Sequence, residues 1–175
     1  MVFRTCSMEK MALSNTFWKN KTVLITGHTG FKGGWLALWL NSLGAHVHGY
    51  ALGPSTIPSF FVAANVESLL ASHTVADIRD ASMLQMTIKS VQPDIVFHLA
   101  AQPLVRQSYI DPVETYTTNV MGTINLFEAV RKISTIKALI NVTTDKCYEN
   151  NKSLKPFVEG DPMGGYDPYA SSKGC

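Results

Sequence analysis

The sequence predicts an α/β fold built on a doubly wound parallel sheet, and three observations lead to it. Short runs of β-branched residues, such as TVLIT at 22–26, have the length and hydrophobicity of strands that are buried on both faces. These runs alternate with segments of helical periodicity, and such alternation produces right-handed βαβ units. A glycine pattern, TGHTGFKG at 26–33, joins the first run to the first helical segment.

Each element has its own signal. Five strands are expected in the sheet order 3-2-1-4-5, at 22–26, 45–50, 73–78, 94–100 and 138–143. Gly44 ends a helix over about 32–43, because glycine adopts the left-handed conformation of a helix C-terminus. A second helix is expected over 60–70, and a third opens at Asp80 and ends before Pro93. A longer helix starts near Pro112, and its apolar residues recur at the spacing of one helix face: Val113, Tyr116, Val120, Ile124, Phe127 and Val130.

The bulk composition is that of one globular domain. The 175 residues carry a formal charge of +2 and no apolar run long enough to cross a bilayer, so neither a nucleic acid nor a membrane is expected as a partner. Cys6, Cys147 and Cys175 lack the spacing of a metal or disulfide motif, and no metal site is expected. We expect residues 1–17 to form a poorly ordered lead-in, residues 18–175 to form the folded domain, and the protein to be cytoplasmic.

The glycine pattern at 26–33, which we call the cradle, is typical of a turn that binds the pyrophosphate of a dinucleotide. Gly27 permits a tight turn, Gly30 lets the backbone approach a phosphate, and Gly33 lets the helix pack close to the strand. The start of the following helix offers free N–H groups and a partial positive charge. The cradle therefore predicts a Rossmann-like domain that binds a dinucleotide, and a glycine turn without a ligand is the alternative.

The adenosine end of this site departs from the common pattern. An acidic residue usually follows the second strand and binds the ribose of NAD, whereas Gly-Tyr-Ala-Leu stands here at 49–52. No arginine cluster is present at this point for the additional phosphate of NADP. Asp77 and Ile78 end the third predicted strand, where an adenine amino group would be bound. For Asp77, a role as a helix cap or turn residue is the alternative.

Tyr169 and Lys173 stand four residues apart, so both side chains lie on one face of a helix. A tyrosine serves as a base at neutral pH only beside positive charge, which the ammonium group of Lys173 supplies. Tyr169 is therefore a candidate base for the proton of a sugar hydroxyl. Thr144 ends the fifth strand, at the edge of the sheet where ligands collect in folds of this class.

Together these segments resemble the extended short-chain dehydrogenase/reductase family, the NAD-dependent epimerases and dehydratases. The resemblance runs from about residue 17 to residue 175 and rests on five strings, TGHTGFKG at 26–33, HLAAQPLVR at 98–106, NVMGT at 119–123, TDKCY at 144–148 and YDPY at 166–169. His28-Thr29 and Lys146 favour the branch of 4,6-dehydratases that acts on CDP-glucose. Relatives that act on dTDP-glucose usually carry Gly-Ala and Glu at these places.

The resemblance implies a mechanism in which NAD stays bound and is regenerated. Tyr169 would take the C4 hydroxyl proton of CDP-glucose while C4 is oxidised, and Asp145 would protonate the C6 hydroxyl as water leaves across C5 and C6. The hydride then returns to C6 and gives CDP-4-keto-6-deoxyglucose, a step of deoxysugar and lipopolysaccharide O-antigen biosynthesis. Sibling enzymes use a glutamate as the C5 base where this chain has Lys146, so the role of that lysine stays open.

The resemblance also implies the set of site residues. Thr144 would bind the C4 oxygen and Lys173 the nicotinamide ribose. The implied catalytic residues are Thr144, Asp145, Lys146, Tyr169 and Lys173. The implied cofactor-binding residues are Gly27, Thr29, Gly30, Phe31, Lys32, Gly33, Asp77, Ile78, Leu99, Ala100, Ala101, Gln102, Asn119, Tyr169 and Lys173.

Simpler interpretations stand beside these. Asp145 and Lys146 are alternatively turn residues, and His98 is expected to be structural rather than catalytic. Asn119 is expected to support the active-site helix through a buried hydrogen bond, with a surface position as the alternative. Arg106 either contacts a substrate phosphate or is solvated.

Finally, the resemblance implies that the chain stops before a C-terminal substrate domain, which full-length relatives carry. We therefore expect apolar surface to be exposed on the fifth strand, and a homo-oligomer for the full-length form. An inactive cofactor-binding fragment is one alternative to an active dehydratase. Another nucleotide-sugar dehydratase or an epimerase of the same superfamily is the other, although a simple epimerase needs no acid such as Asp145.

Overall fold

The computed structural model describes residues 16–149 and 155–175. It contains a five-stranded sheet in the order β3-β2-β1-β4-β5, in which every neighbouring pair is parallel. The strands are β1 (Thr22–Thr26), β2 (His46–Ala51), β3 (Ser72–Val75), β4 (Ile95–His98) and β5 (Ala138–Asn141). The predicted strands and their order are confirmed. The predicted lead-in lies almost wholly in residues 1–15, outside the described part.

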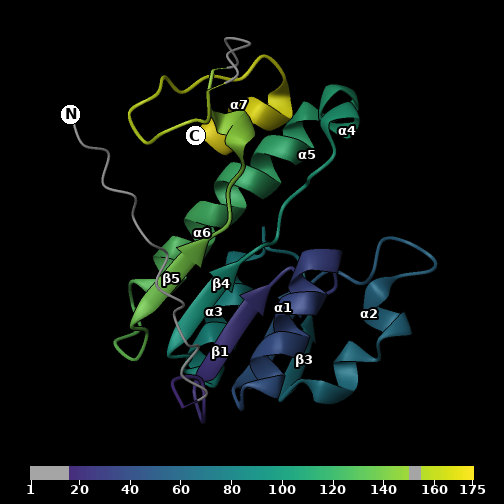
Figure 1. Cartoon of the computed structure of the whole chain (residues 1–175), viewed down its shortest axis with the longest axis vertical. Coiled ribbons are helices and arrows are strands. Elements are labelled where there is room, and N and C mark those ends of the chain that lie inside the picture. The colour runs from purple at the N-terminus through teal and green to yellow at the C-terminus, as the bar shows by residue number, and fades with distance from the viewer. Residues whose placement is uncertain (1–15, 150–154) are drawn as a thin grey trace, which may run out of the picture.

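Helices cover both faces of the sheet (Figure 1). On one face, α1 (Phe31–Ser42), α2 (Phe60–Ala63) and the 3-10 turn η1 (Val66–Leu69) pack against the sheet through a core that includes Val23, Ile25, Leu40, Val47 and Phe61. On the other, α3 (Ala81–Val91) and α6 (Gly122–Val130) pack through a second core that includes Leu24, Leu84, Ile88, Val96 and Leu126. Because β1 and β4 contribute to both cores, their sequences are almost entirely apolar.

Several predicted boundaries are wrong, and the fourth and fifth strands each end two residues earlier than expected, at His98 and Asn141. The helix expected over 60–70 is broken between α2 and η1, because Asn65 adopts a left-handed conformation with φ of 48°. The third strand was expected to reach Ile78 but ends at Val75. Asp77 and Ile78 therefore lie in the turn before α3, whose N-cap is Asp80 as predicted.

The long helix expected after residue 112 has an irregular centre. It consists of α5 (Pro112–Tyr116), one π-helical turn η2 (Thr117–Met121) and α6. The predicted apolar stripe is not its buried face, since Val113, Ile124 and Phe127 are exposed. The buried residues are instead Thr115, Asn119, Gly122, Leu126 and Ala129. A wider π turn shifts the faces of a helix relative to each other, and such turns are frequent at functional sites.

Three short elements gather beyond the carboxyl ends of the strands (Figure 1). They are α4 (Val105–Ile110), the 3-10 turn η3 (Asp145–Cys147) and α7 (Pro168–Gly174), and α7 contacts α4, α5, η2 and η3. The sequence did not predict α4 or η3. Among the described helices, none is long and apolar enough to span a membrane.

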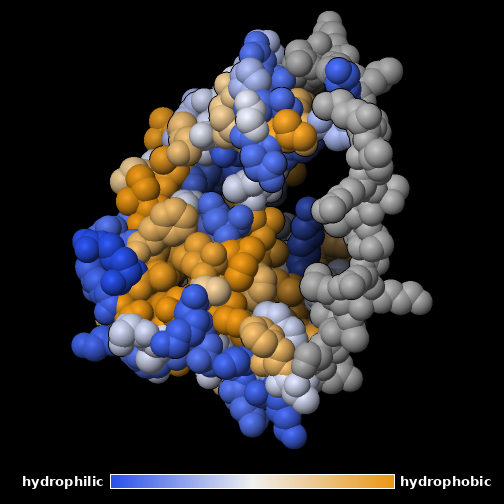
Figure 2. All heavy atoms as spheres, turned by 60° about the vertical axis from the view of Figure 1, so that its left-hand side comes forward, coloured by the Kyte–Doolittle hydropathy of each residue, from blue (hydrophilic) through white to orange (hydrophobic). Residues whose placement is uncertain are grey.

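The β5 edge of the sheet is largely exposed, as the sequence predicted. Ile140 of β5 is 38% exposed, and Ile124 and Phe127 of the neighbouring α6 are also exposed. Figure 2, which brings this side of the molecule forward, shows hydrophobic side chains gathered over it. Large exposed apolar areas of this kind are uncommon on monomeric proteins.

Candidate active site

The cradle has the geometry that its three glycines predict. Gly27 has a φ of +78°, and a Cβ on it would lie 2.7 Å from the backbone nitrogen of Ala100. Gly33 packs directly against the backbone of Gly27, with no room for a side chain. Gly30 is the N-cap of α1, and no side chain caps the N–H groups of the first turn. The start of this twelve-residue helix is therefore left open for an anion.

The other predicted cradle residues lie around this opening. The Thr29 hydroxyl donates to the carbonyl oxygen of Leu52 at 2.8 Å, which ties the cradle to the segment after β2. The side chains of Phe31 and Lys32 are exposed on the first turn of α1. His28, by contrast, is fully buried beneath the cradle, where its Nε2 lies 2.9 Å from Nδ1 of His73.

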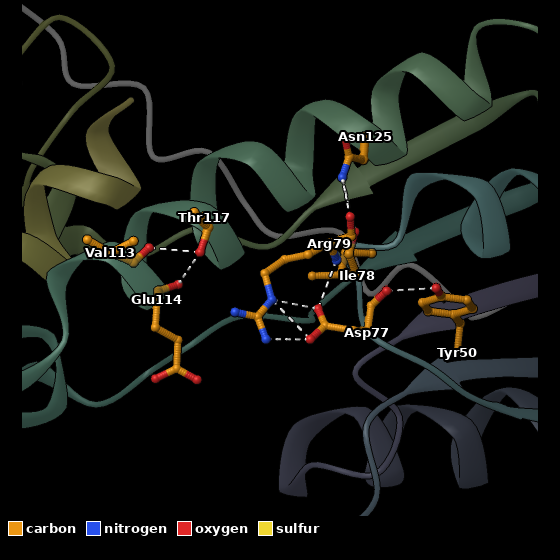
Figure 3. A network of polar contacts seen from close by, with 8 residues as sticks. All are labelled: Tyr50, Asp77, Ile78, Arg79, Val113, Glu114, Thr117 and Asn125. Atoms are coloured by element: carbon orange, nitrogen blue, oxygen red, sulfur yellow. Dashed lines mark hydrogen bonds and ion pairs between the residues drawn. The ribbon is translucent and has the colours of Figure 1, made fainter.

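Asp77, the residue expected at the adenosine end, lies at the centre of a network of polar contacts (Figure 3). Its carboxylate accepts the backbone N–H of Arg79 at 2.8 Å and the guanidinium Nε at 3.0 Å, and these bonds lower the pKa of Asp77. Asp77 is thus a turn residue, as the alternative proposed, but its side chain stays 27% exposed and open to a ligand. The hydroxyl of buried Tyr50 fixes the turn by donating to the carbonyl of Asp77 at 2.8 Å.

Residues 99–102, directly after β4, form the part of the candidate site between the cradle and Asp77. Leu99 and Ala100 donate their N–H groups to the hydroxyl of Thr26, each at 3.2 Å. Ala101 follows them, and Gln102 is bound on both sides of its peptide by Asn119, with the Gln102 N–H at 2.8 Å from Oδ1 and the carbonyl at 3.1 Å from Nδ2. Asn119 is 5% exposed, so the surface alternative for this residue is wrong.

The second predicted motif lies on η3 and α7. Tyr169 is buried in the first turn of α7, and burial lowers the pKa of Lys173 one turn later. Thr144 is the N-cap of η3, and its hydroxyl donates to Asp145 at 3.2 Å. Asp145 and Lys146 are exposed on this turn, which contacts α7. The structure therefore brings the strand-five motif and the Tyr-Lys helix together at one edge of the sheet.

Polar residues that the sequence did not single out hold α7 in place. The backbone N–H of Tyr169 donates to Ser108 Oγ at 3.1 Å, and its carbonyl accepts from Ser172 Oγ at 2.7 Å. Ser172 in turn accepts from Asn119 Nδ2 at 2.9 Å. A lone serine carries no motif, so only the fold reveals this role. Arg106 is exposed on α4, which agrees with both of its alternatives.

The metal-ligating residue types are dispersed. Over residues 16–149 and 155–175, no three His, Cys, Asp or Glu side chains are placed to hold a metal ion. Cys147 is buried and Cys175 exposed, and both are free thiols, whereas Cys6 lies outside the described residues.

Comparisons with known proteins agree with this geometry. The sequence model of the GDP-mannose 4,6 dehydratase family matches residues 24–175. The chain is 53% identical over 163 residues to the CDP-glucose 4,6-dehydratase of Salmonella typhimurium, covering 93% of this chain and 45% of that one. It is 32% identical to the dTDP-glucose 4,6-dehydratase of Xanthomonas campestris over 87% of this chain and 46% of that one. The chain thus spans about half the length of the curated relatives it matches.

Solved structures show the same architecture. The UDP-glucose 4-epimerase of Thermus thermophilus, in complex with NAD, superposes with a TM-score of 0.74 at 28% identity, covering 86% of this chain and 47% of that one. The UDP-glucose 4-epimerase of Thermotoga maritima, with UDP-glucose, gives a TM-score of 0.76 at 27% identity, covering 86% and 47%. With a family match over nearly the whole described length, the chain belongs to the GDP-mannose 4,6 dehydratase family of nucleotide-sugar enzymes.

Proposed function

We propose that the protein is an NAD-dependent hydro-lyase that converts CDP-glucose to CDP-4-keto-6-deoxyglucose. The choice of substrate is carried by one observation, the 53% identity to a CDP-glucose 4,6-dehydratase over 93% of this chain, against 32% to a dTDP-glucose enzyme. Because the chain spans about half the length of such enzymes, the complete activity is assigned to a form of the protein that carries the remaining half.

The cradle supports NAD as the cofactor. The missing side chains at Gly27 and Gly33 leave backbone N–H groups and the uncapped start of α1 facing one opening, which suits a pyrophosphate. Asp77, whose side chain is 27% exposed, offers its carboxylate to the adenine amino group. Buried Ala51 stands at the end of β2, where an acidic ribose ligand is common, so ribose binding relies on other groups. The cradle and Asp77 would hold NAD, which would supply a hydride acceptor for C4 of the sugar and a hydride donor for C6.

The chain's own residues supply the proton transfers. Tyr169, as the phenolate, takes the proton of the C4 hydroxyl. The Thr144 hydroxyl, which donates to Asp145 in the structure, donates to the C4 oxygen once the sugar is bound. Asp145, exposed and next to Thr144, protonates the C6 hydroxyl as it leaves. Lys173, half-buried one turn after Tyr169, presents positive charge to the phenol and binds the nicotinamide ribose.

The C5 base is the open point of this mechanism. Lys146 occupies the place of the glutamate in sibling enzymes, and its side chain is exposed on η3 beside Asp145. We propose Lys146 as the residue that faces the C5 proton. A Lys146→Met variant is expected to oxidise C4 normally but to stop before water is eliminated.

A second candidate function, epimerisation at C4, is favoured by the solved structures, which are UDP-glucose 4-epimerases at 27–28% identity. Epimerisation needs Tyr169 and Thr144 but no acid for a leaving hydroxyl. The carboxylate of Asp145 next to Thr144 supports dehydration instead.

The test compares residues 1–175 with a longer form that carries the C-terminal half of the Salmonella relative. Both forms are expected to bind NAD, and the longer one to convert CDP-glucose to a product with the alkaline absorbance of a 4-keto sugar. Tyr169→Phe should lower that rate by about 100-fold to 10,000-fold, while Tyr166→Phe, which changes a tyrosine that is 80% exposed, should not. Interconversion of UDP-glucose and UDP-galactose without dehydration would establish the epimerase instead.

We also propose a cytoplasmic location, a role in deoxysugar and O-antigen biosynthesis, and a homo-oligomeric full-length form. The proposals on location and pathway rest on the substrate, since nucleotide sugars are the activated donors of sugar transfer. The proposal on assembly rests on the exposed apolar side chains Ile124 and Phe127 of α6. Sedimentation of the longer form tests it, and a monomer at micromolar concentration would contradict it.

A further inference from the structure

The hydrogen bonds around His98 run in one direction, and the direction can be read from donors and acceptors. Thr123 Oγ1 lies 2.6 Å from the carbonyl oxygen of Asn119, which only accepts, so the hydroxyl proton of Thr123 is used there. His98 Nε2 lies 3.0 Å from the same Thr123 oxygen and must therefore donate to it. His98 consequently carries its proton on Nε2.

The other ring nitrogen of His98, Nδ1, extends this series of hydrogen bonds toward the cradle. A neutral imidazole with its proton on Nε2 accepts at Nδ1, which lies 2.7 Å from the hydroxyl oxygen of Thr26. Thr26 donates to this nitrogen, and its oxygen is left to accept the N–H groups of Leu99 and Ala100. Every donor and acceptor in this series of hydrogen bonds is satisfied by only one arrangement of protons, so all of the bonds point in the same direction.

The two ends of this series of hydrogen bonds contact the two halves of the candidate site, the cradle and α7. At one end lie Leu99 and Ala100, against which Gly27 of the cradle packs. At the other end lies Asn119, whose side chain binds Ser172 of α7 and whose backbone accepts from Thr123. His98 is 3% exposed and stands in β4 between them.

We propose that His98 is a positioning residue that couples the dinucleotide cradle to the helix carrying Tyr169 and Lys173. This assignment deepens the proposed function and rests on it. Through Nδ1 the ring orients Thr26 and thereby the peptide at 99–100 under the cofactor. Through Nε2 it orients Thr123 and Asn119, and thereby the backbone of α7. His98 has no proton-transfer role of its own.

The environment of the ring keeps it in the required state. Burial, together with the nearby ammonium group of Lys173, lowers the pKa of His98 to about 4, so the imidazole is neutral at physiological pH. The ring must be neutral because a doubly protonated His98 would carry a donor at Nδ1 as well. Thr26 could then no longer donate to it, and the common direction of the hydrogen bonds would be lost.

Two substitutions separate the two halves of this role. In His98→Asn the side-chain oxygen replaces Nδ1 and keeps the bond to Thr26, whereas in His98→Gln the amide nitrogen replaces Nε2 and keeps the bond to Thr123. We expect His98→Asn to lower kcat about tenfold with NAD affinity unchanged, which is the value of one buried hydrogen bond. We expect His98→Gln to weaken NAD binding about tenfold with kcat at saturating NAD retained. His46→Gln, which alters an exposed histidine of β2, is the matched control.

A measurement without catalysis stands beside these. Nitrogen-15 NMR of the histidine rings in residues 1–175 is expected to show His98 with a protonated Nε2 and a bare Nδ1 at neutral pH. A proton on Nδ1 would overturn the assignment whatever the enzyme does. Equal losses of kcat and NAD affinity in both variants would also overturn it, because they would indicate a merely structural histidine. A third outcome separates the two proposals. If no form dehydrates any sugar, but His98 carries its proton on Nε2 and His98→Gln weakens NAD binding, the dehydratase proposal fails while the link from His98 to the cradle stands.

Discussion

Ser108 accepts a hydrogen bond from the backbone N–H of Tyr169 at 3.1 Å, across 61 residues of sequence. Ser108 is fully buried in α4, and its own hydroxyl proton goes to the carbonyl of Val105 at 2.7 Å. The first turn of a helix has N–H groups without partners inside the helix, and here one of them is bound by a different helix. The position of the candidate base therefore depends on α4 as well as on α7.

Ser108→Ala should destabilise the protein and displace Tyr169. The buried N–H would lose its acceptor, which costs about 1–3 kcal/mol in the free energy of unfolding. Urea denaturation measures that loss, and the dehydratase assay should show kcat reduced about tenfold with KM for CDP-glucose little changed. The control is Ser42→Ala, in which an exposed hydroxyl bonded to Trp39 is removed and water replaces it. An unchanged kcat would show that α7 is positioned without Ser108.

Gly27→Ala should abolish NAD binding. The new Cβ would lie 2.7 Å from the backbone nitrogen of Ala100, and the φ of +78° adds about 1–2 kcal/mol of strain. Calorimetric titration should show affinity for NAD reduced more than about 100-fold, a loss of about 3 kcal/mol in binding free energy. Gly53→Ala is the matched control, because nothing lies within 4 Å of a Cβ at that position. Retained affinity in Gly27→Ala would rule out the cradle as the pyrophosphate site.

Gly49 and His28 should be coupled in stability. A Cβ on Gly49 would lie 2.5 Å from the imidazole of His28, so Gly49→Ala should destabilise the fold by about 1–3 kcal/mol through overpacking. In a background with His28→Ala the same change meets an empty space and should cost far less. A double-mutant cycle measured by urea unfolding is therefore expected to give a coupling of about 1–3 kcal/mol. Additive effects would place the His28 ring elsewhere.

The two buried histidines should make the protein acid-sensitive. Burial lowers the pKa of His28 and of His98 to about 4, from 6.5 for an unperturbed histidine. As the pH falls from 6.5 to 4, the unfolded chain binds these protons first, so the free energy of unfolding decreases across that window and is unaffected by these groups above it. The loss approaches about 3 kcal/mol for each residue.

Urea unfolding at about pH 7 and about pH 5 measures this dependence. His98→Gln removes one titrating group, so its stability should fall less between the two conditions than that of the unaltered protein. An equal slope in both proteins would mean that folding does not lower the pKa of His98.

The sheet and the glycines were predictable because they rest on local rules. Strands such as β1 and β4 are buried on both faces, so hydrophobicity alone marks them, and the cradle depends on residues that are adjacent in sequence. The left-handed Asn65 and the π turn around Asn119 were not predictable, because tertiary contacts select them against local preference. Apolar spacing assumed a regular helix after residue 112 and therefore chose the wrong face.

The residues of the candidate site also fall into two groups, those that the sequence predicted and those that only the structure identifies. Tyr169, Lys173 and Thr144 were found by spacing, since their chemistry needs fixed residue types. Ser108, Ser172 and Thr26 act through their position in space, and each has many equivalents in the sequence. Asp77 was expected at the end of the third strand but lies after it, and its pairing with Arg79 depends on a turn that begins three residues earlier than predicted.

The π turn at Thr117–Met121 has a consequence for how this segment tolerates insertions and deletions. Removing one residue would let the turn relax to an ordinary α-helix, with all of its backbone bonds intact. The same change would rotate everything before it by about 100° relative to α6. Thr115 would then turn away from Gln102, which it contacts at 2.9 Å. The number of residues between Pro112 and Val130 is thus as constrained as their identity, and a comparison of alleles at this locus should show substitutions here without changes in length.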